Sequence, residues 1–402
     1  MSEIDHLIYK KIYPDSGAIF NLNVEPIEKV KGNCIYVLDT NVLLTPYTTS
    51  KTSLKGITAI YKKLIDQQRL FIPGHVAREF AMNRPEKIKE IFSTLTKKQS
   101  NQRSFFIDEY PLLEDNNMYK KIISKQKELD QLFNEHRKLL SSLAKTIKNW
   151  NWNDPVSEVY RDLFTTKVIY DPDLDEKIIK EEYEKRQKHK TPPGYRDYSK
   201  PINADGDLLI WFTILKLAEE KKQNIIFVSS DEKSDWFHRA EKQPLIPRFE
   251  LQYEYKSKIQ NKSFYIIRLS DLLKLYSVSE KIIDEIKNSE NIEIRDTQKK
   301  NILLAIKNKR CLEFYYNGGY RTAEPYCYGV SRKGNDLLRA FQTGGYSESS
   351  EPANWKLFAV EKMSNITITD EEFSGNRPEY KLNDPAMEDI YCNIFNYEIK
   401  EK

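Results

Sequence analysis

The chain has 402 residues, of which 39% are hydrophobic and 31% charged, with only 13 glycines and 17 prolines. This length and composition predict a folded protein of about two domains, and they exclude collagen-like, low-complexity and largely disordered chains. With 64 Lys and Arg against 60 Asp and Glu the net charge is +4, which excludes a histone-like protein but not a local basic groove.

The cysteines lie far apart in the sequence, and none forms a C-x-x-C pair: they are Cys34, Cys311, Cys327 and Cys392. This spacing supports neither a zinc ribbon nor a disulfide scaffold. The N-terminus has no apolar signal region, and no apolar run reaches the roughly 18 residues of a membrane span. We therefore expect a cytoplasmic protein with no membrane partner.

The first part of the chain alternates apolar runs with helical patterns. Residues 34–44 (CIYVLDTNVLL) predict a buried strand that Asp39 interrupts, and residues 53–69 have helical spacing. Further along, the pattern predicts a strand at 70–73 and a helix that begins at residue 75. Three more helices are predicted at 118–149, 173–190 and 203–222. A strand is predicted at the start of 224–237, and a strand followed by a helix within 263–276. This alternation favours an α/β fold with a parallel sheet covered on both faces and a helical insertion at about 86–200.

The pattern changes near residues 277–298, which are polar and show no clear strand. A helix at 297–309 and several short β-like segments follow. We therefore predict a first domain at 1–285 and a smaller, β-rich domain at 286–402.

Carboxylates recur where predicted strands end or helices begin. They are Asp39, Glu79, Asp205, Asp207, Asp231 and Asp235. Ligands bind at the carboxyl edge of a parallel α/β sheet, and carboxylates gathered there need cations, with Mg²⁺ or Mn²⁺ suiting an oxygen-rich site. Such ions can position a water for attack on a phosphodiester. Asp39 is the strongest single candidate because a charge inside an apolar run is costly to bury, whereas Asp205 is equally explained as a helix cap.

Four motifs in this order resemble the PIN-like domain nucleases: VLDTNVLL, IPGHVAREF, GDLLIW and FVSSDEKSDWF. The resemblance covers about residues 30–275 and is closest to the bacterial branch with a long helical insertion and a P-P-G-Y-[KR]-D loop, here residues 192–197. It implies a three-layer α/β/α fold and a metal-dependent endonuclease that usually acts on RNA.

The resemblance also implies roles for individual residues. The catalytic acids would be Asp39, Glu79, Asp207 and Asp231. The metal ligands would be Asp39, Asp207, Asp231 and Asp235, and the supporting residues would be Asn41, Ser229 and Asp205. Other chemistries fit less well: a haloacid-dehalogenase-like phosphatase needs an acid where Asn41 stands, and neither a G-x-G-x-x-G nor a P-loop motif is present.

Nucleic-acid contact is predicted for basic and aromatic residues near these motifs, namely Arg78, Tyr195, Arg196 and Lys200. Lysine-rich helices of the insertion are equally explained as solvated surfaces.

The C-terminal segments resemble a divergent WYL-type domain. The similarity rests on the Y-x-x-x-x-R-x-x-E-P run at 316–325 and on LLRAFQ at 337–342. It implies a small SH3-like β-barrel that senses a nucleic-acid or nucleotide ligand through Arg321 and Arg339. The alternative is that one of these arginines pairs with Glu324 or another acid of the same domain.

Together these observations predict a metal-dependent endonuclease that acts on nucleic acid, with RNA favoured over DNA, and that has a regulatory C-terminal domain. The pairing of a nuclease with a sensor domain suggests, by extrapolation, a role in phage defence or toxin-type growth control. Two alternatives stay open. The chain could be a non-catalytic nucleic-acid-binding regulator with a degenerate nuclease domain. The insertion and C-terminal domain could also serve mainly to build a homo-oligomer.

Overall fold

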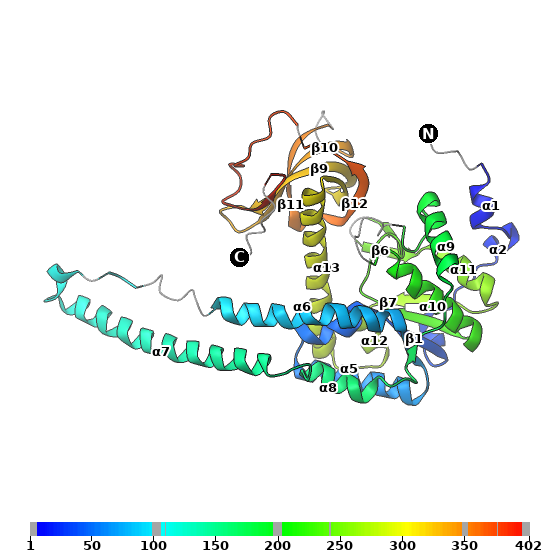
Figure 1. Cartoon of the computed structure of the whole chain (residues 1–402), viewed down its shortest axis with the longest axis horizontal. Coiled ribbons are helices and arrows are strands. Elements are labelled where there is room, and N and C mark those ends of the chain that lie inside the picture. Colours follow the sequence, from blue (N-terminus) through cyan, green and yellow to red (C-terminus); the bar gives the residue numbers. More distant parts are fainter. Residues whose placement is uncertain are drawn as a thin grey trace.

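The computed structural model describes residues 6–98, 106–108, 110–195, 203–240, 243–347, 353–375 and 377–395. Two hydrophobic cores are present, one built around a parallel sheet and the other around an antiparallel sheet. A single long helix, α13 (Glu280–Asn308), runs from one to the other (Figure 1).

The first core contains a five-stranded parallel sheet with the order β3-β2-β1-β4-β7. Its strands are β1 (Cys34–Leu38), β2 (Leu70–Pro73), β3 (Ile169–Tyr170), β4 (Asn224–Val228) and β7 (Phe264–Ile267). Every residue of β1 is buried, as expected for a central strand covered on both faces. The parallel sheet and its packed helices confirm the predicted α/β class.

Helices from the whole first part of the chain accompany this sheet. They are α1 (Ile8–Ile12), α2 (Ser16–Phe20), α3 (Ile27–Val30), α4 (Thr40–Leu44), α5 (Lys51–Asp66), α6 (Gly74–Lys98), α7 (Asn117–Lys148), α8 (Pro155–Leu163), α9 (Glu176–His189), α10 (Gly206–Lys221), α11 (Phe249–Lys258) and α12 (Leu269–Leu275). The core brings together buried side chains of α5, α10 and α12, such as Tyr61, Trp211 and Leu272. None of the described helices is both long and apolar enough to span a membrane.

The prediction of one strand over residues 34–44 was wrong in its second half. β1 ends at Leu38, and Asp39 is the N-cap of α4, where its side chain accepts a hydrogen bond from the Thr40 backbone N–H. An aspartate at this position favours helix initiation. The apolar residues that follow are buried in a helix instead of continuing the strand.

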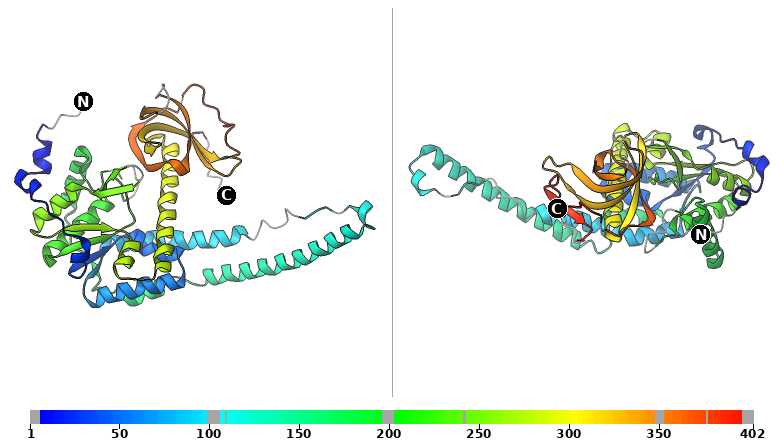
Figure 2. Two further views of the ribbon diagram at one scale, coloured as in Figure 1. Left: turned by 180° about the vertical axis from the view of Figure 1, so that it is seen from behind. Right: turned by 90° about the horizontal axis from the view of Figure 1, so that it is seen from above.

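The insertion forms a long arm. α6 and α7 extend well beyond the body of the molecule, as the two views of Figure 2 show. The insertion is not purely helical, because β3 pairs with β2 at the edge of the parallel sheet. A separate hairpin, β5 (Phe237–Ala240) and β6 (Gln243–Pro247), follows β4 and had no counterpart in the sequence pattern.

The C-terminal part is an antiparallel sheet with the order β11-β10-β9-β8-β12, in which β13 also pairs with β9. Its strands are β8 (Arg310–Tyr316), β9 (Gly319–Val330), β10 (Asp336–Gly345), β11 (Asn354–Ala359), β12 (Ser364–Glu372) and β13 (Asp389–Asn393). The β-rich character is as predicted, while closure into an SH3-like barrel stays a prediction.

Helix α13 begins earlier than the predicted helix at 297–309. Its first half buries Ile283 and Ile286 in the first core, and its second half buries Ile302 and Ile306 in the second. The predicted domain boundary between residues 285 and 286 lies inside this helix.

Candidate active site

The candidate site lies at the carboxyl edge of the parallel sheet, where β1 and β4 end side by side. β1 is central, with β2 on one side and β4 on the other. The chain therefore leaves β1 toward β2 and later returns on the opposite side of β1 as β4. Such a point in a parallel sheet opens a crevice for ligands. Asp39 directly follows β1, and Ser229 to Asp231 directly follow β4.

Asp39 is held by three hydrogen bonds. Its Oδ1 accepts from the Thr40 backbone N–H at 2.7 Å, and its Oδ2 accepts from Asn41 Nδ2 at 2.8 Å and from the Ser229 hydroxyl at 2.5 Å. The other end of the Asn41 amide accepts from the Ser230 backbone N–H at 3.0 Å. These bonds join the two strand ends into one rigid unit around the Asp39 carboxylate.

The charge environment of Asp39 is that of an anion cluster. Its pKa is raised to about 7, mainly by burial and also by the neighbouring carboxylates of Glu79, Asp231 and Asp207, while the Ser229 hydrogen bond acts in the opposite direction. Four acids from four segments of the chain thus act electrostatically on one another at this edge.

Glu79, on α6, is positioned by several partners. The Thr40 hydroxyl donates to one of its carboxylate oxygens, and the Asn203 amide donates to the other. His75, one turn earlier, lies 3.6 Å from Glu79 Oε1 through its Nε2. Burial would raise the pKa of Glu79, but these hydrogen bonds outweigh burial and lower it. Glu79 is therefore held as a fixed anion beside Asp39.

Asp207 and Asp231 share a lysine. The Lys233 ammonium lies 2.7 Å from Asp231 Oδ2 and 3.5 Å from Asp207 Oδ2. The Asp231 backbone N–H donates to the Ser229 hydroxyl at 3.0 Å, so this acid is tied to the residue that bonds Asp39. Lys233 thus places a positive charge between two of the clustered carboxylates.

Two further predicted acids have other neighbours. Asp235 is fully buried, and its Oδ2 accepts from the Gly194 backbone N–H at 2.9 Å, which ties it to the Pro-Pro-Gly-Tyr loop. Asp205 is the N-cap of α10 but makes no side-chain capping hydrogen bond, and its charge acts on His75.

The donor set fits a small divalent cation in its chemistry. Within the described ranges, no three His, Cys, Asp or Glu side chains already enclose one cation position. The candidate ligands are nevertheless carboxylates, whose oxygens Mg²⁺ and Mn²⁺ prefer, and Asp207 and Asp231 already attract the Lys233 ammonium. A metal ion at this edge would compete with Lys233 for the same oxygens.

A comparison with protein families matches the chain to a family described as PIN like domain over residues 35–251, more than half of its length. The chain belongs to the PIN-like domain family. No curated protein and no solved structure matches it. The match spans Asp39, Glu79, Asp207 and Asp231 and ends before the C-terminal sheet. PIN-like membership indicates a nuclease-type function and a nucleic-acid substrate at the coarse level.

The residues predicted to contact nucleic acid are only partly visible in this PIN-like domain. Arg78 makes an exposed, two-bond ion pair with Asp171, with contacts of 2.5 and 3.1 Å. Tyr195 is half-buried at the end of the Pro-Pro-Gly-Tyr loop. Arg196 and Lys200 lie outside the described residues.

The two arginines predicted to line a ligand surface in the C-terminal sheet differ in their surroundings. Arg321 is buried among Tyr316, Tyr346 and Phe358, and it donates to Gln342 Oε1 at 3.0 Å. Arg339, by contrast, pairs with Asp384 through contacts of 2.5 and 3.1 Å. Glu324, the alternative partner considered from the sequence, pairs with Arg377.

Sequence reasoning missed three residues of the site. Thr40 and Asn203 hold Glu79, and Lys233 bridges two acids. Thr40 and Lys233 stand inside the quoted motifs, next to Asp39 and two residues after Asp231, so proximity to an acid was a usable signal. Asn203 contacts Glu79 across 124 positions of the sequence, and no local pattern indicates that.

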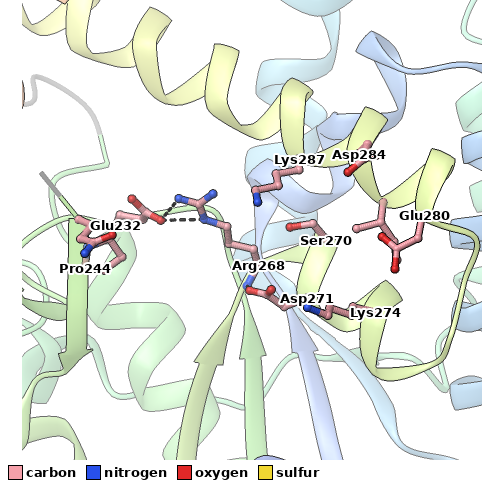
Figure 3. A pocket seen from close by; sticks show the side chains of 11 residues that line it. Glu232, Pro244, Arg268, Ser270, Asp271, Lys274, Glu280, Asp284 and Lys287 are labelled. Atoms are coloured by element: carbon pink, nitrogen blue, oxygen red, sulfur yellow. Dashed lines mark hydrogen bonds and ion pairs between the residues drawn. The ribbon is translucent and has the colours of Figure 1, made fainter. Parts of the chain in front are cut away.

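A polar cavity of about 340 Å³ adjoins the loop that carries Asp231 (Figure 3). Its wall includes Glu232 from that loop, Arg268 after β7, and Lys287 from α13. The Arg268 guanidinium bonds Glu232 across the cavity. The cavity therefore lies between the loop that follows β4 and part of helix α13.

Proposed function

We propose that the protein is a metal-dependent endonuclease that hydrolyses phosphodiester bonds of nucleic acid, with RNA as the favoured substrate. The observation that carries this proposal is the buried Asp39 carboxylate, fixed by Asn41 and Ser229 and surrounded by Glu79, Asp207 and Asp231. A cluster of anions at a sheet edge is unfavourable by itself, so its natural complement is a divalent cation together with a phosphate.

In this proposal Asp39, Asp207 and Asp231 hold the cation, and Glu79 adds a fourth negative charge beside it. When bound, Mg²⁺ or Mn²⁺ supplies charge neutralisation for the phosphodiester and lowers the pKa of a bound water. Asn41 and Ser229 keep the Asp39 carboxylate in one orientation. Lys233, released from Asp207 and Asp231, is placed to meet a phosphate oxygen.

The C-terminal sheet, in the same proposal, is a WYL-like sensor of nucleic acid or nucleotide. Its support is the sequence pattern around Arg321 and the aromatic rings that surround its buried guanidinium. Among the described residues this guanidinium donates to the Tyr316 carbonyl and to Gln342 and forms no ion pair. A nuclease joined to such a sensor suits phage defence or toxin-type growth control.

Cleavage by the purified full-length chain tests the proposal. Wild type is incubated with single-stranded and double-stranded RNA and DNA in Mg²⁺ or Mn²⁺, with a chelator as the metal-free control. We expect divalent-dependent internal cleavage of RNA, and we expect Asp207→Asn to lower the rate by roughly 100-fold or more because it removes a metal ligand. Asp66→Asn, an exposed residue at the end of α5, is the matched control and should cut like wild type.

Failure of wild type to cut any substrate in either metal would contradict the enzyme proposal. Retained binding of nucleic acid in that case would favour the non-catalytic regulator.

A further inference from the structure

The arm helix α7 carries an exposed apolar stripe. Six apolar side chains lie along one side of this 32-residue helix and are 44% to 69% exposed. They are Met118, Ile122, Leu129, Leu132, Leu139 and Leu143. The two remaining positions of the stripe are occupied by Lys125 and His136. So much apolar surface on a projecting helix is unusual unless another molecule covers it.

The stripe is separate from the face that α7 turns toward its own chain. Ala144 and Ile147, near the body, are buried, and Phe133 contacts Phe106. The exposed side chains lie on the flank of that face. Figures 1 and 2 show that α7 itself extends away from the body.

The spacing of the stripe selects a helix as its partner. Its eight positions, from 118 to 143, are separated by alternating steps of four and three residues. This is the heptad repeat of a coiled coil, in which apolar positions of one helix fit between those of another. The stripe extends over more than three heptads, which is the length at which such a pattern becomes significant. The helix itself is about 48 Å long at 1.5 Å per residue.

The order of residues in the stripe favours α7 of a second copy, in antiparallel orientation, as the partner. Read from either end, the stripe has two apolar residues, one basic residue, two apolar residues, one basic residue and two apolar residues. Antiparallel pairing would therefore place apolar side chains opposite apolar side chains in every layer except those of Lys125 and His136. Parallel pairing would instead place Lys125 directly against Lys125 of the other chain, and like charges in direct opposition destabilise such a contact.

Charges beside the stripe also suit a second copy. Glu128 and Glu135 flank the central layers, and Lys125 already contacts Glu128 at 2.6 Å within its own helix. In the antiparallel pair, Glu135 adjoins the layer that holds Lys125 of the other chain and offers it a second carboxylate. Because the body is attached at the C-terminal end of α7, antiparallel arms also keep the two bodies at opposite ends.

We propose that the protein forms a homodimer through antiparallel pairing of the α7 helices of two copies, along the stripe from Met118 to Leu143. A two-fold axis passes between Leu129 and Leu132, so the interface is isologous. In the dimer the two PIN-like domains would lie at opposite ends of the paired arms, and each would carry its own candidate site. This inference does not depend on the proposed nuclease activity.

Sedimentation velocity of the full-length chain over a range of concentrations tests the dimer. The stripe variant is the double substitution Leu132→Glu and Leu139→Glu, and the matched control is Gln131→Glu with Ser141→Glu, which adds the same charge to exposed positions outside the stripe. We expect the stripe variant to raise the dimer dissociation constant by roughly 100-fold because it places carboxylates in the apolar seam. The control should sediment like wild type, and circular dichroism should show equal helix content in all three.

Disulfide trapping tests the direction of pairing. Ile122 and Leu139 face each other only in the antiparallel register, so chains carrying Ile122→Cys and chains carrying Leu139→Cys should cross-link when mixed and not when kept separate. The native cysteines are all buried, so they compete little with the introduced ones.

Two results would overturn the proposal: a wild type that stays monomeric at all concentrations, or a dimer that the stripe variant leaves intact. Cross-linking of each single variant with itself would overturn the antiparallel register in favour of a parallel one.

Discussion

Lys233 is the residue that most directly links charge to metal binding at the candidate site. Its ammonium contacts Asp231 and Asp207, the same oxygens that a divalent cation would use. The lysine therefore balances two acids in the metal-free protein, and in the proposed mechanism a metal ion would displace it from their oxygens. The displaced ammonium would then be a positive group beside the phosphate.

Substitution of Lys233→Gln should therefore have opposite effects on two measurements. Without the competing ammonium, Mn²⁺ should bind more tightly, by a few-fold to tenfold, in a calorimetric titration. Cleavage at saturating Mn²⁺ should fall, because the phosphate loses a cationic partner. Weaker Mn²⁺ binding by the variant would show that Lys233 does not compete with metal.

Asp39 should make the stability of the metal-free protein depend on pH. Its folded-state pKa of about 7 lies above the ordinary value of 3.8, so between these two values the folded state binds more protons than the unfolded state. The stability contributed by the protonated acid is thus present at low pH and is lost as the pH rises through 7. Asp39→Asn removes this dependence because the amide does not titrate.

The measurement is thermal unfolding of both proteins with a chelator at about pH 5 and pH 8. The melting temperature of Asp39→Asn relative to wild type should rise by a few degrees between the two conditions. An unchanged difference would mean that the environment of Asp39 does not raise its pKa.

At the scale of elements, α13 is a helix that contacts both the loop after β4 at the candidate site and the C-terminal sheet. Its Glu290 is fully buried, and it accepts hydrogen bonds from the Ser270 backbone N–H at 3.2 Å and from the Ser270 hydroxyl at 2.7 Å. The same carboxylate lies 3.5 Å from the hydroxyl of Ser230, the residue whose backbone N–H bonds Asn41. A shift of α13 would therefore reach Asp39 through two intervening residues, Ser230 and Asn41.

Glu290→Ala should lower the free energy of unfolding by about 1–3 kcal/mol, because it leaves the Ser270 and Ser230 donors without an acceptor in a buried site. It should also slow cleavage, because Ser230 is less firmly held. Urea unfolding and a cleavage assay measure the two effects. Asp284→Ala, exposed on the same helix, is the control, and equal effects of both substitutions would count against a special role for Glu290.

The sequence was informative about the site because its acids adjoin strand ends or lie in short motifs. Asp39 and Asp231 each follow an apolar strand directly, so their meeting at one sheet edge could be predicted from the topology of parallel sheets. The helix at 40–44 was missed because a short apolar run does not distinguish a strand from a buried helix. The two-residue strand β3 and the hairpin β5–β6 were missed because these strands are too short to show a clear period, and β6 contains two prolines.

At the scale of the whole molecule, two cores share one helix, and a long arm extends from the first core (Figure 1). The sequence predicted that the pattern of alternating strands and helices ends near residue 285. It could not show that one helix continues across this boundary. The polar residues in the middle of α13 read locally as a linker, whereas the apolar residues at its two ends belong to different cores. This arrangement connects the C-terminal sheet to the core of the PIN-like domain through one continuous helix.

The central claim is that the carboxylates around Asp39 form a metal-dependent nuclease site. The most direct measurement compares wild type with Asp39→Asn for cleavage of single-stranded RNA in Mn²⁺, after circular dichroism has shown that both are folded. We expect wild type to cut internally and the variant to be slower by roughly 100-fold or more. Equal cleavage by the two proteins would contradict the claim, because the activity would then arise elsewhere.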